Sequence, residues 1–205
     1  TSCTPSFKKG EIGANGITFN KNGDIILCQH GDRRVAKISN IKSNNPEFIT
    51  IIDKYQGKRF NSPNDLSISK NGDIYFTDPP YGFFFFWKNF DNRYREIDFN
   101  GVYKLSNKGK VELISKEMTL PNGIALSLDQ KYIYVNNSDR ENDPKIMKYD
   151  TTTFQGTLFF DGKELVKKYQ GGFDGLKVHS SGNIFTSGPN GILIISPDGK
   201  LMAMI

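Results

Sequence analysis

The chain has 205 residues, 37% of them hydrophobic and 13% aromatic, and a formal net charge of +5. This length can bury a sizeable core, in which Phe and Tyr would dominate. The basic residues are scattered, whereas nucleic-acid binders concentrate positive charge on one face, so we expect no nucleic-acid partner. No apolar run approaches the roughly 18–20 residues of a membrane span. We therefore expect no membrane partner and a soluble protein, cytoplasmic or exported if a leader was removed; its oligomeric state stays open.

The two cysteines fit no metal-binding spacing. Cys28 ends an apolar run that begins at Ile25, so we interpret it as a small core residue rather than a reactive thiol. A disulfide between Cys3 and Cys28 stays open.

One unit recurs along the chain. It begins with a polar residue, continues through a short apolar strand and a tight turn, and returns along a second strand. The leading residues, at positions 15, 64, 122 and 174, are separated by 49, 58 and 52 residues. Repeats of about 40–50 residues with several short strands are typical of β-propeller blades. The four copies cover residues Asn15–Leu27, Asn64–Thr77, Asn122–Val135 and Asp174–Thr186.

Further strand-like runs lie between these hairpins. Third strands are predicted at 35–38, 101–105, 145–149 and 191–195, and fourth strands at 47–52, 110–114 and 157–160, with another at the end of the chain. Four strands per repeat make a blade, so we predict an all-β protein, with about four propeller blades in one partial domain over residues 1–205. In the second hairpin, Asn71-Gly72 predicts a two-residue turn with positive φ at both positions.

A loop of roughly twenty residues follows the second hairpin. Two prolines end the strand, and the aromatic run Phe83–Trp87 comes soon after them. Long loops in compact domains are usually functional or disordered, and a high aromatic content argues against disorder. We favour a lid beside a pocket; a contact with another subunit is the alternative.

The leading polar residues are in phase, which means that each holds the same position in its repeat. Equivalent positions of successive blades converge on a propeller axis, so these side chains would gather amide oxygens and one carboxylate in the channel. Oxygen ligands suit a hard cation, Ca²⁺ before Mg²⁺ or Mn²⁺, and the shortage of His and Cys argues against a typical Zn²⁺ site. Alternatively, Asn and Asp simply favour the ends of loops. The four positions are Asn15, Asn64, Asn122 and Asp174.

Several motifs resemble, in the right order, the signatures of the SMP-30/gluconolactonase family. They are Cys28–Val35, Asn61–Asp65, Phe76–Gly82, Leu120–Ala125 and Phe173–Val178. The resemblance implies a six-bladed propeller that hydrolyses lactones with one divalent cation, Ca²⁺ first and Mg²⁺, Mn²⁺ or Zn²⁺ as alternatives. By motif, its cation ligands correspond to Asn64, Asn122 and Asp174. The family's first-blade Glu, in a Glu-Gly-Pro motif, has no match here. The chain thus resembles an internal fragment, and whether it is active by itself stays open.

We expect a sugar lactone as the substrate. Arg59, Asn61 and His30 are predicted to contact its hydroxyl groups, with Asn15 and Tyr81 also at the pocket; a surface ion pair is the alternative role for Arg59. Asp174, the single carboxylate among the in-phase positions, is predicted to hold the cation and to help deprotonate the attacking water.

Two other functions stay open at this point. An NHL-like binding propeller has similar repeats but tolerates variable residues before the Gly, where this chain always has Asn or Asp, with Asp65 in place of the Gly in the second repeat. A strictosidine-synthase-like propeller would need an acidic channel residue and no metal.

His30 is the next candidate for the general base if Asp174 proves to be a cation ligand only.

Overall fold

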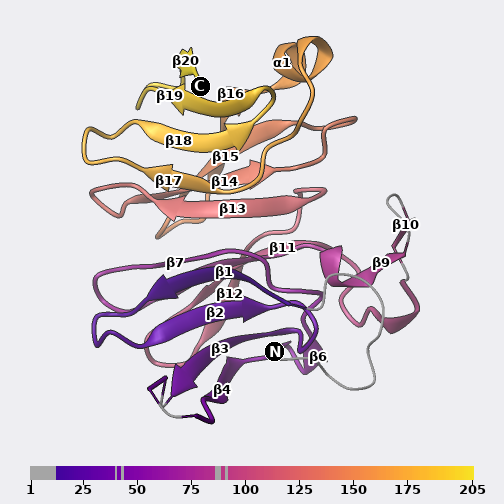
Figure 1. Cartoon of the computed structure of the whole chain (residues 1–205), viewed down its shortest axis with the longest axis vertical. Coiled ribbons are helices and arrows are strands. Elements are labelled where there is room, and N and C mark those ends of the chain that lie inside the picture. Colours follow the sequence, from indigo (N-terminus) through magenta and orange to yellow (C-terminus); the bar gives the residue numbers. More distant parts are fainter. Residues whose placement is uncertain (1–12, 40, 43, 86–88, 91) are drawn as a thin grey trace. The chain divides into compact units, whose positions relative to one another are not determined.

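The computed structural model describes residues 13–39, 41–42, 44–85, 89–90 and 92–205. The chain forms two compact units, Thr1–Leu113 and Ile114–Ile205, each built around two four-stranded antiparallel sheets (Figure 1). These four sheets confirm the predicted blades. That residues 1–205 form a single domain remains a prediction.

Unit 1 contains two four-stranded sheets and two short hairpins. The first sheet follows chain order, with β1 (Ala14–Phe19), β2 (Ile25–Gln29), β3 (Arg34–Ser39) and β4 (Glu47–Ile52). The second has the order β12-β11-β8-β7, with β7 (Leu66–Ile68), β8 (Ile74–Asp78), β11 (Gly101–Leu105) and β12 (Val111–Ser115). The short hairpins pair β5 (Lys54–Tyr55) with β6 (Lys58–Arg59) and β9 (Phe84–Phe85) with β10 (Asn89–Phe90).

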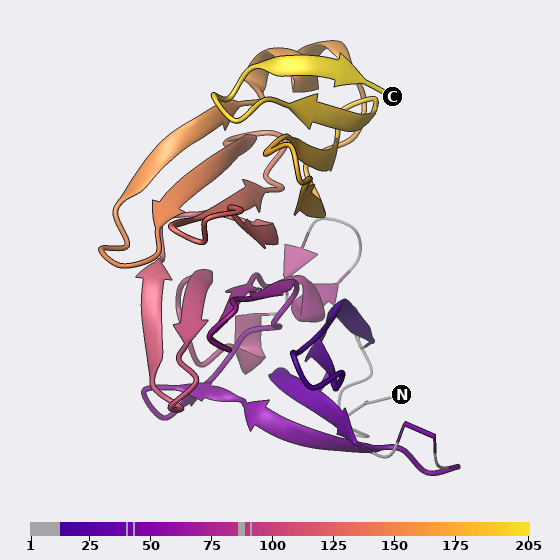
Figure 2. The ribbon, with the colours of Figure 1, turned by 90° about the vertical axis from the view of Figure 1, so that its left-hand side faces the viewer.

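Unit 2 repeats the four-stranded arrangement twice. Its sheets are β13 (Pro121–Leu126), β14 (Tyr132–Asn137), β15 (Lys145–Asp150) and β16 (Gly156–Asp161), then β17 (Leu176–Val178), β18 (Ile184–Gly188), β19 (Gly191–Ile195) and β20 (Leu201–Met204). Figure 2 shows the yellow strands of the last sheet side by side near the C-terminus. Helix α1 (Lys163–Lys168) joins the two sheets, and the described part of the chain holds no other α-helix. None of its helices is long and apolar enough to cross a lipid bilayer.

The long loop between β8 and β11 contains short elements of its own. It contains two 3₁₀ turns, η1 (Tyr81–Phe83) and η2 (Asn92–Tyr94), on either side of the β9–β10 hairpin. Phe83 is buried, and the Arg33 guanidinium lies 5.1 Å from the centre of its ring. Residues 86–88 of the predicted lid lie outside the described residues, so the lid remains a prediction.

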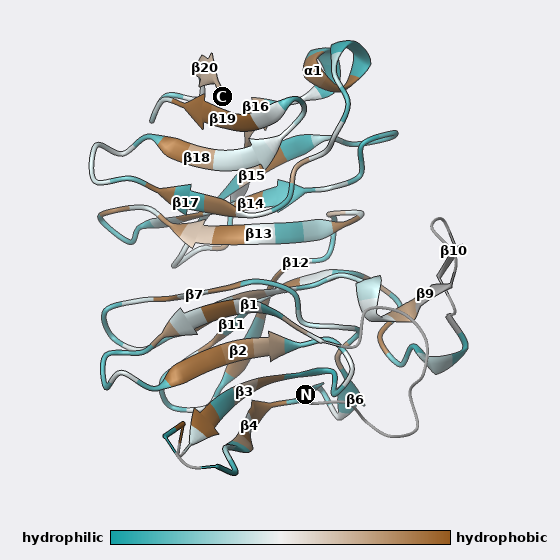
Figure 3. Cartoon of the chain, in the orientation of Figure 1, coloured by the Kyte–Doolittle hydropathy of each residue, from teal (hydrophilic) through white to brown (hydrophobic). Residues whose placement is uncertain are grey.

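Aromatic rings fill the core of unit 1, as the composition predicts. Phe60, Phe76 and Tyr103 are fully buried, and their ring centres lie 5.1–5.3 Å apart. Burying one such side chain stabilises the fold by about 1.5–3 kcal/mol. Cys28 is a free thiol in the same core, where burial raises its pKa, which confirms its structural interpretation. Figure 3 shows the apolar character of the inner strand β2. Because Phe60 immediately precedes Asn61–Asn64, the core anchors the segment that carries the candidate ligand.

The turn at Asn71-Gly72 differs from the prediction. Only Gly72 has a positive φ, +92°, and the Ser69 N–H donates to the Asp73 carbonyl oxygen. The loop is therefore a three-residue turn with glycine in the left-handed position. The side chain of Asn71 supports this turn, because its Oδ1 accepts the Asp73 N–H at 3.1 Å.

Candidate metal and substrate site

The leading polar residues lie at the start of the first strand of each sheet. Within each unit, two of these starts meet. The Gly16 N–H donates to the Asn64 carbonyl oxygen at 2.6 Å in unit 1, and the Gly123 N–H donates to the Asp174 carbonyl oxygen at 3.0 Å in unit 2. The structure therefore brings the Asn15 segment to Asn64, and the Asn122 segment to Asp174.

Close approach explains why glycine follows two of these residues. A Cβ on Gly16 would lie 2.6 Å from the Asp65 Cα, and one on Gly123 would lie 2.2 Å from the Asp174 carbonyl oxygen. Neither glycine has a positive φ. The Asn-Gly pairs in these positions therefore reflect the packing of one strand start against the next, and not turn chemistry.

Asn64 is the most constrained of the candidate ligands. It is 1% exposed, and its backbone N–H donates to the Thr77 carbonyl oxygen at 2.8 Å. Its side-chain Nδ2 lies 3.3 Å from His30 Nε2, but its Oδ1 has no hydrogen-bond partner in the part of the chain that the structure describes. An unpaired buried acceptor costs about 1–3 kcal/mol. An oxygen left unpaired in this way is suited to a ligand that the protein itself does not supply.

His30 lies near Asn64, Tyr81 lies near His30, and both are buried. His30 follows the end of β2, and its ring centre is 6.5 Å from that of Tyr81. His30 and the candidate ligand Asn64 therefore lie together in unit 1. Direct contact of these two residues with a substrate remains a prediction.

Asn61 is engaged with the protein itself. Its Nδ2 donates to the Phe99 carbonyl oxygen at 2.8 Å, and its Oδ1 accepts from Arg95 Nε at 3.3 Å. Its backbone N–H donates to Asp78 Oδ2 at 2.8 Å, and the Ser62 N–H donates to Asp78 Oδ1 at 2.7 Å. Burial raises the pKa of Asp78 to about 7, although these two hydrogen bonds act to lower it. Asp78 therefore clamps the segment that leads to Asn64.

Arg59 is half-buried and holds a neighbouring loop. Its Nη2 donates to the Asp32 carbonyl oxygen at 2.7 Å, and its backbone N–H donates to Glu96 Oε2 at 2.9 Å. Arg33 lies deeper, with its Nε 2.6 Å from the Phe60 carbonyl oxygen. The predicted role of Arg59 in binding sugar hydroxyls therefore stays a prediction.

In unit 2, Asn122 is buried and Asp174 is exposed. The Asp174 carboxylate makes no hydrogen bond or ion pair with the described residues, while its carbonyl oxygen accepts from Asn136 Nδ2 at 2.6 Å. Asn136 Nδ2 also lies 2.8 Å from Thr186 Oγ1. The carboxylate that the sequence singles out is thus accessible, and its backbone is fixed from two sides.

Sequence reasoning missed Asp78, Arg33 and Asn136. Asp78 and Asn136 share a signal that could have found them: each is a polar residue at or next to the end of the second strand of a hairpin, after a run of apolar residues. No local pattern marks Arg33, because its partners come from segments 27 and 61 residues away.

The donor chemistry favours amide oxygens. Across residues 13–205, apart from the few positions that the structure leaves undescribed, no three His, Cys, Asp or Glu side chains gather as a cation site. The unpaired Asn64 Oδ1 fits a hard cation, which prefers neutral and anionic oxygen ligands.

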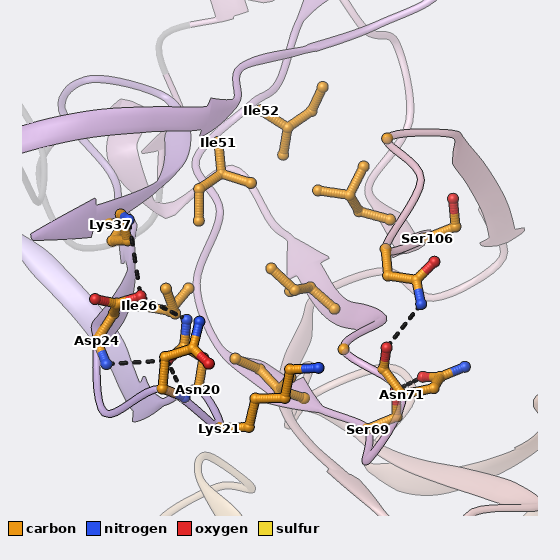
Figure 4. Close-up of a pocket in the computed structure, with 17 residues that line it drawn as sticks. Asn20, Lys21, Asp24, Ile26, Lys37, Ile51, Ile52, Ser69, Asn71 and Ser106 are labelled. Carbon is orange, nitrogen blue, oxygen red and sulfur yellow. Dashed lines mark hydrogen bonds and ion pairs between the residues drawn. The ribbon is translucent and has the colours of Figure 1, made fainter.

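A cavity of about 690 Å³ lies elsewhere in unit 1, among the hairpin turns (Figure 4). Its inner wall is apolar and includes Ile26, Ile51 and Ile52, and at its rim Asp24 lies between Asn20 and Lys37. None of the predicted site residues lines it.

The structural comparisons identify a β-propeller of the gluconolactonase type. A gluconolactonase structure from Xanthomonas campestris matches with a TM-score of 0.80 and 26% identity, over 94% of this chain and 61% of that one. In sequence, the chain is 38% identical to a gluconolactonase from Zymomonas mobilis, over 98% of this chain and 56% of the relative. It is 25% identical to the lactonohydrolase oryL of Aspergillus oryzae, over 76% of this chain and 39% of the relative.

The SMP-30/Gluconolactonase/LRE-like region matches residues 2–205, and the chain belongs to this family. The resemblance drawn from its motifs is therefore confirmed. The chain spans about half the length of the curated relatives that it matches.

Proposed function

We propose that the protein hydrolyses a sugar lactone with the help of one divalent cation, Ca²⁺ first. Family membership supports lactone hydrolysis over a non-enzymatic binding propeller or a strictosidine-synthase-like one. The observation that carries the cation is the unpaired, buried Oδ1 of Asn64. Asn122 and Asp174, whose segment starts meet in unit 2, are the other proposed ligands.

A bound divalent cation would stabilise the oxyanion that develops on the lactone carbonyl oxygen when water attacks. Asn64 and Asn122 are neutral, so as ligands they leave most of the cation's charge uncancelled. Asp174 is proposed to accept a proton from the attacking water, because its exposed carboxylate is held by no partner among the described residues. Asn15, His30, Arg59, Asn61 and Tyr81 are the proposed surroundings of the substrate.

The test separates the two roles of Asp174 in the full-length protein. Hydrolysis of a six-membered sugar lactone is followed by acid release, after chelation and after Ca²⁺ is restored. We expect chelation to abolish the activity and Ca²⁺ to recover it. Asp174→Asn should lower kcat by about 10²–10⁴-fold even at saturating Ca²⁺, since general base catalysis contributes that much.

Asp129→Asn, at an exposed turn of the same unit, is the matched control and should leave kcat unchanged. Near-normal kcat of Asp174→Asn at saturating Ca²⁺ would make Asp174 a ligand only. Full activity of the chelated wild type would remove the cation from the proposal.

A further inference from the structure

We propose that His30 is a positioning residue, which determines which atom of the Asn64 amide faces the cation. This inference rests on the proposed function, because it concerns one of the proposed ligands. It assigns to His30 a role different from the predicted contact with substrate hydroxyls.

The backbone of Asn64 is fixed on both sides. Its N–H donates to the Thr77 carbonyl oxygen at 2.8 Å, and its carbonyl oxygen accepts the Gly16 N–H at 2.6 Å. The freedom that remains is rotation of the side chain, and an amide presents either an oxygen or an NH₂ group in nearly the same shape. Only the oxygen can bind a cation.

The contact with His30 distinguishes these two orientations. Asn64 Nδ2 can only donate a hydrogen bond, so at 3.3 Å it requires His30 Nε2 to be the acceptor, with the ring proton on Nδ1. This pairing directs Nδ2 to the histidine and leaves Oδ1 unpaired. The amide oxygen is thereby selected before any cation arrives.

His30 is itself held firmly enough to act in this way. It is 2% exposed, its N–H donates to the Gly13 carbonyl oxygen and its carbonyl oxygen accepts the Arg33 N–H, each at 3.1 Å. Its ring lies beside the buried Tyr81. A buried ring with a fixed backbone is suited to orienting a neighbour.

Without an acceptor at this position, the amide would divide its population between both orientations, and the apparent cation affinity would fall with the competent fraction. Removal of residues that orient metal ligands typically costs 10–100-fold in affinity. We therefore expect His30→Phe, which keeps a ring beside Tyr81 but has no acceptor, to weaken Ca²⁺ binding by about 10–100-fold. His30→Gln restores an acceptor and should bind Ca²⁺ within about threefold of wild type.

The experiment is calorimetric titration of the full-length, metal-free variants with Ca²⁺ alone, with melting curves to confirm folding. His30→Leu replaces His30→Phe if the latter does not fold. The Asn64→Asp variant is the internal control, because both terminal atoms of the Asp side chain are oxygens. In that background His30→Phe should change the Ca²⁺ affinity less than about threefold, since no choice of atom remains.

Three outcomes separate the inference from the proposed function. Unchanged Ca²⁺ affinity in Asn64→Ala would contradict the proposed ligand set. Weak binding by Asn64→Ala but normal binding by a folded His30→Phe would overturn only the positioning role. Equal losses in His30→Phe and His30→Gln would also overturn it, because a lost acceptor would not then be the cause.

Discussion

The two ends of the sheets in unit 1 differ in how completely their buried polar groups are paired. At the turn end, formed by the hairpin turns Asn20–Asp24, Ser69–Asp73 and Ser106–Lys110, polar groups are paired. Asp73 Oδ1 accepts the Asn107 N–H at 2.9 Å, and Lys104 Nζ lies 3.3 Å from Asp73 Oδ2. At the polar end, around His30, Asn64 and Asp78, the Asp78 carboxylate is paired as well. Asn64 Oδ1 and Gln29 Nε2, however, are buried there without partners among the described residues.

Under the proposed function, this difference separates groups that stabilise the fold from a group that is available to a ligand. Both ends use the same strands, so the backbone alone does not cause it. Each buried unpaired group destabilises the fold, and such groups persist where something other than folding favours them. The turn end stabilises the hairpins, whereas the polar end keeps an oxygen available.

The largest effects are expected from replacing one asparagine at each end by alanine. Asn64→Ala should lower both the Ca²⁺ affinity and kcat/KM by more than about 100-fold. It should change the free energy of unfolding by less than about 1 kcal/mol, because the loss of the contact between Nδ2 and His30 is offset by removal of the unpaired Oδ1. Asn107→Ala, which loses a hydrogen bond to the Asn71 carbonyl oxygen, should leave activity intact and cost about 0.5–1.5 kcal/mol of stability. Lactone hydrolysis, calorimetry and urea unfolding measure these quantities. A large loss of stability in Asn64→Ala would contradict the comparison.

Glycine substitutions provide a second, smaller test. Gly16→Ala places a methyl group 2.6 Å from the Asp65 Cα at the polar end, and we expect it to cost about 1–3 kcal/mol, the usual penalty of overpacking. Gly23→Ala at the turn end has open space but a φ of +80°, and it should cost about 1 kcal/mol through backbone strain alone. Only Gly16→Ala should also weaken Ca²⁺ binding, because it displaces the Asn64 backbone. Unchanged Ca²⁺ affinity in a folded Gly16→Ala variant would show that the Gly16 segment does not position Asn64.

The sequence predicted the strands well, because alternating residues and turn residues report local structure. The predicted run 101–105 matches β11, and 47–52 matches β4. The in-phase position of Asn64 was equally readable. The role of Asn61 could not be predicted, because the Phe99 and Arg95 groups that bond to its side-chain amide come from another segment. The roles of Asp78 and Asn136 likewise depend on burial and on distant partners, which no local pattern encodes.

The last prediction uses the two buried carboxyl groups at opposite ends of β8. Burial raises the pKa of Asp78 to about 7. For Asp73, burial acts in the same direction, but hydrogen bonds from the Asn107 N–H and the Asn71 and Lys104 side chains outweigh it and lower the pKa. The unfolded value for Asp is about 3.9. A raised pKa means that the folded state binds the proton more tightly, so the contribution of Asp78 to stability declines as pH rises from about 4 to 7.

Urea unfolding at pH 5 and pH 8 should therefore distinguish the two carboxyl groups. The stability advantage of wild type over Asp78→Asn should shrink by more than about 1 kcal/mol between these pH values, because the amide does not titrate. The advantage over Asp73→Asn should stay constant, since a lowered pKa makes the contribution of Asp73 complete above about pH 4 and lost only in more acidic solution. Parallel behaviour of the two variants would mean that Asp78 remains ionised, stabilised by its hydrogen bonds from Asn61 and Ser62. The polar end would then hold a satisfied carboxylate, as the turn end does, and the contrast would rest on Asn64 and Gln29 alone.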